Sequence, residues 1–143
     1  MADEIPLLAT KLFLPPRVAV VQRPRLTARL NDGLTRPLTL VSAPAGSGKT
    51  TLLSEWRASK QSREVELAWL ALDPEDNEPA RFLTYLIAAV ARVRPGFGQA
   101  ALALLRAPQT VPAETILAHL IREWCELQAP LVLALDDFHL ITA

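Results

Sequence analysis

The sequence has few of the features that would place it in a membrane or in an oxidising compartment. Only one of its 143 residues is a cysteine, Cys125, so no disulfide can form within the chain. No apolar run approaches the ~20 residues that span a bilayer, and the N-terminus lacks the charged region and apolar region of a secretory signal. We therefore expect a soluble, cytoplasmic protein in a reducing compartment.

An excess of charge of one sign is also missing. Fifteen Lys and Arg residues balance fifteen Asp and Glu residues, so the composition offers no general reason for binding to nucleic acid or to an anionic membrane. Half of the residues are hydrophobic and 21% are charged, which is typical of a globular chain. Internal repeats and low-complexity tracts are absent, and the length suits one domain.

The cysteine, the histidines and the tryptophans of this sequence are not predicted to be catalytic or metal-binding residues. Cys125 lies in a helical pattern, and we expect a buried, inert thiol. His119 and His139 have no partner at metal-ligand spacing, so no metal role is predicted for them. Three tryptophans fall in apolar periodic segments and are predicted to be core residues: Trp56, Trp69 and Trp124.

The most informative stretch that is present is a glycine-containing loop between an apolar run and a helical pattern. Gly46 and Gly48 allow the backbone to take positive φ and to approach a ligand closely. The N–H groups of such a loop form an anion-binding nest at a helix N-terminus. Lys49 is placed to reach the β- and γ-phosphates of a nucleotide, and Thr50 to bind Mg²⁺ through its hydroxyl oxygen. The predicted nucleotide-binding residues of this P-loop are Ala43, Pro44, Ala45, Gly46, Ser47, Gly48, Lys49, Thr50 and Thr51.

One residue departs from the usual pattern of this loop. Ala43 stands where GxxxxGK[ST] has its first glycine. Because the strand before the loop, the lysine and the two threonines all agree with the pattern, we treat the departure as minor.

A second apolar run ends in two carboxylates. Residues 131–135 are predicted to form a buried strand, and Asp136 and Asp137 follow it. An acid at the C-terminal end of a parallel strand lies at the edge of the sheet where ligands bind. We expect Asp136 to orient Mg²⁺, through water, and Asp137 to polarise the attacking water as a base. This is the Walker B arrangement, and with the P-loop it predicts a site for ATP and Mg²⁺.

A third acidic segment contains Asp73, Asp76 and Glu78. Its spacing does not match a calcium loop, which needs a glycine at the sixth position and a distal glutamate. We expect a capped and solvated loop rather than a cation site.

Strands and helices are predicted to alternate, which indicates an α/β fold with a parallel sheet. The predicted strands are 38–42, 65–72 and 131–135. The apolar character of the first suits burial on both faces, and the last is predicted to be buried. Helices are predicted from Pro24, from the P-loop to about Ser59, from Pro79, over 99–105 and from about Pro112. The last of these has an apolar face made of Ile116, Leu117, Leu120, Ile121, Trp124 and Leu127.

Many short motifs occur in a characteristic order. They include Thr10-Lys11-Leu12 with Pro15-Pro16, Arg23-Pro24-Arg25-Leu26, the loop within residues 40–53, Ala68-Trp69-Leu70, Asp76-Asn77, Pro79-Ala80-Arg81-Phe82, and Leu135-Asp136-Asp137-Phe138-His139-Leu140-Ile141. Together they resemble the N-terminal nucleotide-binding region of the MalT-like, large ATP-binding regulators of the LuxR type, which are STAND-class signal-transduction ATPases. The resemblance covers essentially the whole chain.

The resemblance implies a regulator and, at most, a slow regulatory ATPase. In that family ATP with an inducer favours a multimeric, DNA-binding form, and ADP favours a resting monomer. Arg23 matches an arginine that contacts the nucleotide in related STAND proteins, although Gln22 stands where a glycine usually precedes it. The family binds DNA through a helix-turn-helix that this sequence does not contain, and no membrane partner is implied.

The resemblance also implies a division of the chain and a gap in its sheet. We expect residues 1–37 to form an extended segment and a helix carrying Arg23, and residues 38–143 to form a partial P-loop ATPase core (STAND- and AAA-related) that ends after the Walker B strand. In such ATPases a later strand lies between the P-loop strand and the Walker B strand, so an unpaired strand edge is predicted.

Two other functions remain open from the residues alone. One is a stand-alone P-loop kinase of a small molecule, which needs an acceptor site and usually a lid with several arginines. The other is a non-catalytic interaction fragment in which the P-loop has lost its function.

Overall fold

The computed structural model describes residues 7–13, 23–36, 38–42, 48–59 and 64–142. The chain divides into two compact units, one formed by Leu14–Glu66 and the other by Met1–Phe13 with Leu67–Ala143. The P-loop residues Ala43 to Ser47, including Gly46, lie outside the described ranges.

The unit of residues 14–66 is built on two helices, α1 (Pro24–Gly33) and α2 (Lys49–Arg57), which contact each other. Pro24 occupies the first helical position, where its missing N–H is not needed, and α1 ends at Gly33 as expected. Trp56 on α2 is buried and donates its indole N–H to Asn31 Oδ1 on α1 at 2.8 Å. This hydrogen bond joins the two helices.

The strand predicted at residues 38–42 is not formed. These residues take no strand conformation, and Leu38 and Leu40 each expose 78% of their surface. The prediction of a strand buried on both faces is therefore wrong for this structure. A strand needs a neighbouring strand that satisfies its N–H and C=O groups. In the described part of the chain the sheet has two strands, which pair with each other, and residues 38–42 are in neither.

Those two strands, β1 (Glu66–Ala71) and β2 (Leu131–Asp136), form a parallel pair in the other unit. The Leu72 N–H donates to the Asp136 carbonyl oxygen at 2.9 Å, just beyond the end of β1. The pair confirms the α/β class and the two strand predictions. In β1 the three residues from Ala68 to Leu70 are buried. Every residue of β2 is only half-buried, so the burial predicted for residues 131–135 is not found.

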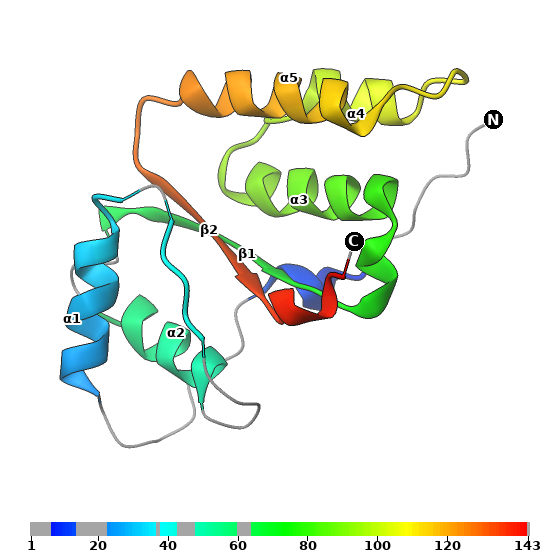
Figure 1. Cartoon of the computed structure of the whole chain (residues 1–143). Helices are drawn as coiled ribbons and strands as arrows, with labels where there is room; N and C mark the ends of the chain where they lie inside the picture. The colour runs from blue at the N-terminus through cyan, green and yellow to red at the C-terminus, as the bar shows by residue number, and fades with distance from the viewer. Residues whose placement is uncertain (1–6, 14–22, 37, 43–47, 60–63, 143) are drawn as a thin grey trace. The chain divides into compact units, whose positions relative to one another are not determined.

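Three helices complete this unit: α3 (Pro79–Val93), α4 (Gln99–Leu105) and α5 (Ala113–Cys125). Figure 1 shows them on one side of the two strands, and α4 and α5 both contact α3. Apolar residues of β1, α3 and α5 share one core, with Leu70, Tyr85 and Ile116 among its members. Short 3₁₀ helices lie at Ala9–Leu12 (η1), Pro74–Asn77 (η3) and Phe138–Leu140 (η4).

The apolar face of α5 is narrower than predicted. Ile116 and Leu120 are buried, but Leu117 and Ile121 are 44% and 56% exposed. Cys125 is also exposed, so the prediction of a buried thiol is wrong. Residues four apart lie above one another on a helix, and Cys125 continues the exposed row of Leu117 and Ile121 rather than the buried one.

The tryptophans behave largely as predicted. Trp56 and Trp69 are each 3% exposed. Trp124 is half-buried and packs against the core, where its ring meets that of Phe97 edge-on at a centroid distance of 6.2 Å. Both histidines, His119 and His139, lie at exposed positions.

Candidate nucleotide site

The end of the P-loop has the backbone conformation that the sequence predicts. Gly48 has φ 85° and ψ 27°, a left-handed conformation that favours glycine, and α2 begins at the next residue. Lys49, Thr50 and Thr51 therefore form the first turn of a helix, where backbone N–H groups lack intrahelical acceptors and favour an anion.

Arg23 lies against this turn. Its Nη2 donates to the Gly48 carbonyl oxygen at 3.0 Å, and the same oxygen accepts the Leu52 N–H at 2.8 Å. A Cβ added to Gly48 would lie 3.3 Å from Nη1 of Arg23, so the guanidinium packs directly on the glycine. The structure thus brings together two residues that the sequence analysis placed in the nucleotide site for separate reasons.

Glu55 connects Arg23 to α2, and the sequence analysis did not identify it. Glu55 is 7% exposed. Its Oε1 accepts the backbone N–H of Arg23 at 2.5 Å, and its Oε2 lies 3.8 Å from Arg23 Nε. The signal in the sequence is weak, because Glu55 stands between Ser54 and Trp56 in a helix of mixed polarity, and an acid needs a partner only where it is buried.

The Walker B acids lie at the end of β2, the position expected for metal-orienting carboxylates. Asp136 is half-buried and Asp137 is exposed. Asp137 has φ 60°, a left-handed conformation that aspartate tolerates better than most residues, and its N–H donates to Asp136 Oδ1 at 3.1 Å. These acids and the P-loop turn belong to different compact units.

Asn77 ties the segment after β2 to the loop after β1. Its Nδ2 donates to the Leu140 carbonyl oxygen at 2.8 Å, and its Oδ1 accepts the Thr142 N–H at 2.6 Å. The two strand ends of this unit are therefore held to each other beyond the sheet itself.

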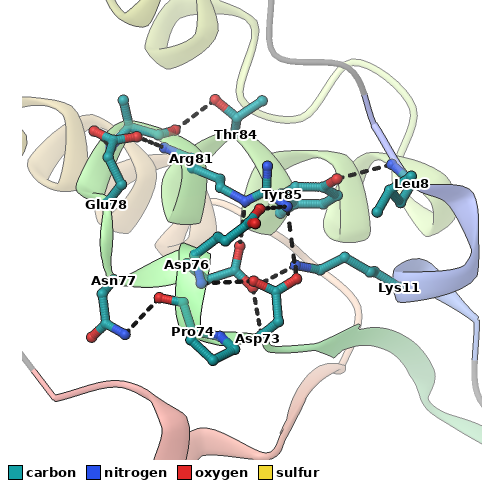
Figure 2. Close-up of polar contacts among 12 residues, drawn as sticks. Leu8, Lys11, Asp73, Pro74, Asp76, Asn77, Glu78, Arg81, Thr84 and Tyr85 are labelled. Atoms are coloured by element: carbon teal, nitrogen blue, oxygen red, sulfur yellow. Dashed lines mark hydrogen bonds and ion pairs between the residues drawn. The ribbon is translucent and has the colours of Figure 1, made fainter.

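The acidic loop after β1 is capped as predicted, but one of its acids, Asp76, is buried. Asp73 and Asp76 form a reciprocal capping box at the start of η3. Asp76 is 1% exposed, and Figure 2 shows Lys11 pointing toward both carboxylates, with Nζ 2.7 Å from Asp73 and 2.5 Å from Asp76. Arg81 Nε lies 3.3 Å from the other oxygen of Asp76. The prediction of a solvated loop holds at Glu78, which is exposed, and is wrong at Asp76, which is contacted by Lys11 from η1 and Arg81 from α3.

This charged cluster is a structural site rather than a vacant cation site. Lys11 also lies over the Tyr85 ring, 4.2 Å from its centroid, and the Tyr85 hydroxyl oxygen accepts the Leu8 N–H at 2.9 Å. The hydrogen bond from Lys11 holds the pKa of Asp73 below its ordinary value of 3.8, although burial opposes that shift. Protein cations already supply the positive charge that these acids need.

Two further features are absent from the described residues. No helix among them is both long and apolar enough to cross a membrane. Within the same residues, no three or more His, Cys, Asp or Glu side chains are grouped so that they could hold a metal ion.

Known proteins are similar to this chain over almost the whole of its own length. The chain is 39% identical to the HTH-type transcriptional regulator MalT of Cronobacter sakazakii over 137 residues, and equally identical to MalT of Yersinia enterocolitica over 137 residues and of Klebsiella pneumoniae over 136. These alignments cover 94–95% of this chain but 15% of each relative.

The resemblance to MalT-like regulators is thereby confirmed, and so is the P-loop class of the fold. The model of one protein family, described as AAA domain, matches residues 32–143, which include the P-loop and both Walker B acids. The chain belongs to the AAA domain family.

Proposed function

We propose that the chain is the ATP-binding switch module of a MalT-type transcriptional regulator and acts in the cytoplasm. Residues 1–37 form the part that carries Arg23, and residues 38–143 form the P-loop ATPase core. The observation that carries the proposal is the contact of Arg23 with Gly48 at the turn where α2 begins. The AAA domain match and the similarity to MalT support it.

Each candidate residue has a role in holding Mg²⁺ and ATP or ADP. The P-loop residues from Ala43 to Gly48 and the first turn of α2 bind the phosphates, through backbone N–H groups except at Pro44, and Lys49 neutralises the phosphate charge. Thr50 and Asp136 hold the metal, which shields phosphate charge when bound. Asp137 orients the attacking water, and slow hydrolysis then resets the switch.

The fit of these residues to a nucleotide rests on backbone geometry and donor chemistry. Gly48 takes a left-handed conformation at the turn where α2 begins, and the Arg23 guanidinium lies where a side chain of residue 48 would be. Two carboxylates end a parallel strand, at the edge of the sheet where this class of fold binds ligands. Hard oxygen donors of this kind are those that Mg²⁺ prefers.

In the full-length regulator, ATP binding favours self-association and DNA binding, and ADP favours a resting monomer. The DNA-binding role is proposed for another part of that protein, because the chain spans only 15% of the length of the MalT relatives. The module's own role is to change state with the nucleotide, as phosphate-sensing switches do.

Titration of the whole chain with Mg·ATP and Mg·ADP tests the proposal. Lys49→Ala should weaken binding of both nucleotides by about ten-fold or more, since a charge-assisted contact to phosphate is worth about 1.5–3 kcal/mol. Arg25→Ala is the matched control, because it removes one positive charge at an exposed position of α1. Equal binding by wild type and Lys49→Ala would overturn the proposal, and turnover that depends on a small-molecule acceptor would favour a kinase instead.

A further inference from the structure

Glu55 is a buried carboxylate whose hydrogen bond and ion pair, among the described residues, are both with Arg23. It lies on α2, it is 7% exposed, and its two oxygens face the backbone N–H and the Nε of Arg23. A carboxylate withdrawn from water is costly unless it is paired and hydrogen-bonded. The placement of this charge on the P-loop helix therefore needs an explanation beyond packing.

The two contacts define both the origin and the direction of the Arg23 side chain. Arg23 is the residue that precedes the first turn of α1, so the bond to its N–H fixes where the side chain leaves the backbone. Oε2 lies 3.8 Å from Nε, an ion pair without a hydrogen bond, and its buried charge favours the orientation in which the guanidinium stays near α2. Together they aim the guanidinium at Gly48.

The far end of the guanidinium reaches the phosphate loop. Nη2 bonds the Gly48 carbonyl oxygen at 3.0 Å, and Nη1 lies 3.3 Å from the place of a Cβ on that glycine. Among the described residues, the polar contacts of the guanidinium use Nη2 and Nε, so Nη1 is available to a phosphate oxygen. Arginine presents such donors in a fixed fork that suits phosphate.

We propose that Glu55 is a positioning residue that holds Arg23 on the phosphate loop and thereby sets the affinity for the nucleotide. This inference rests on the proposed function, because it assumes that the loop binds a nucleotide. Glu55 does not touch the nucleotide, and its whole effect passes through Arg23. Replacing Glu55 lets the guanidinium leave Gly48, and the nucleotide must then order it on binding.

A double-mutant cycle on Mg·ATP binding separates this role from a general effect on the fold. Glu55→Gln keeps an acceptor for the Arg23 N–H but loses the charge that orients Nε. We expect it to weaken Mg·ATP binding about five-fold in the wild-type background and not at all in an Arg23→Ala background, as coupled residues do. Glu64→Gln, at an exposed position of the same unit, is the matched control and should bind as wild type does.

Nucleotide binding and melting temperature of a third variant, Arg23→Lys, complete the test. This variant retains a positive charge but loses the forked guanidinium donors, so it should weaken Mg·ATP binding without lowering the melting temperature. It also tests the inference if Glu55→Gln proves too unstable to titrate. Equal weakening by Glu55→Gln in both backgrounds would overturn the inference, and so would wild-type affinity in Glu55→Gln or in Arg23→Lys. If the wild type does not bind Mg·ATP, or binds it no better than Lys49→Ala, the proposed function itself has failed.

Discussion

Two aspartates lie at or soon after the end of each strand of the larger unit, and the two pairs differ in environment. After β1, Asp76 is buried and Asp73 is half-buried, and both contact Lys11 and Arg81. After β2, Asp136 is half-buried and Asp137 is exposed. The first pair is neutralised by Lys11 and Arg81, whereas Asp137 of the second pair is exposed to solvent.

The different environments of the two pairs show that an acid at a strand end is not by itself a metal site. Lys11 and Arg81 satisfy the first pair, so its charge stabilises the attachment of η1 and α3 to the strand end. Asp137 also holds a left-handed conformation, and such strain is commonly found at functional sites. The environment of each pair, rather than its residue type, separates a structural role from a proposed catalytic one.

The largest expected effect that tests this comparison is on stability. Lys11→Met removes the cation that contacts both acids after β1 and leaves Asp76 buried with less compensation. We expect the free energy of unfolding to fall by about 3–5 kcal/mol, as when one partner of a buried ion pair is lost, measured by urea denaturation. Asp137→Asn, at the exposed pair, should change it by less than about 0.5 kcal/mol. A similar loss in both variants would remove the distinction between the two pairs.

A smaller effect is expected at the other pair, and on ligand binding rather than on folding. Asp136→Asn should weaken Mg²⁺-dependent ATP binding about ten-fold, the size typical for a group that orients a metal ligand, with the urea midpoint unchanged. Titrations with and without Mg²⁺ measure the effect, and Asp73→Asn serves as the control at the neutralised pair. Loss of Mg²⁺ dependence in Asp73→Asn but not in Asp136→Asn would reverse the assignment.

The smallest effect is a dependence of stability on acid pH. Lys11 lowers the pKa of Asp73 in the folded protein below its ordinary value of 3.8. The stabilisation from this group is therefore complete above pH 3.8 and is lost as the pH falls through the lower, folded pKa. Urea midpoints measured from pH 5 downward should fall less steeply in Asp73→Asn than in wild type. Parallel profiles for the two proteins would show that Asp73 does not carry the effect.

Local sequence patterns predicted most of the helices well. Pro24 and Pro79 begin α1 and α3 as expected, because proline suits the first helical position. The helix predicted over residues 99–105 has those bounds in the structure. Periodicity also located β1 and β2, although it overestimated the burial of β2 and the width of the apolar face of α5.

The errors share a cause in long-range contacts. Residues 38–42 have the composition of a strand but no strand partner in the described structure. Asp76 was expected in solvent because the sequence gives no sign that Lys11, 65 positions away, reaches it. Glu55 was missed for a similar reason, since its partner Arg23 is 32 positions distant.

The sequence by itself determined the elements that depend on neighbours along the chain: the left-handed glycine turn at Gly48, the helix starts and the acids at the end of β2. Such features follow from φ preferences, capping and periodicity, which act over a few residues. Only the tertiary structure decided which charges are paired, which apolar rows are covered and which residue aims Arg23. Those outcomes depend on contacts between distant segments, whose energies are set by burial and geometry that no local pattern records.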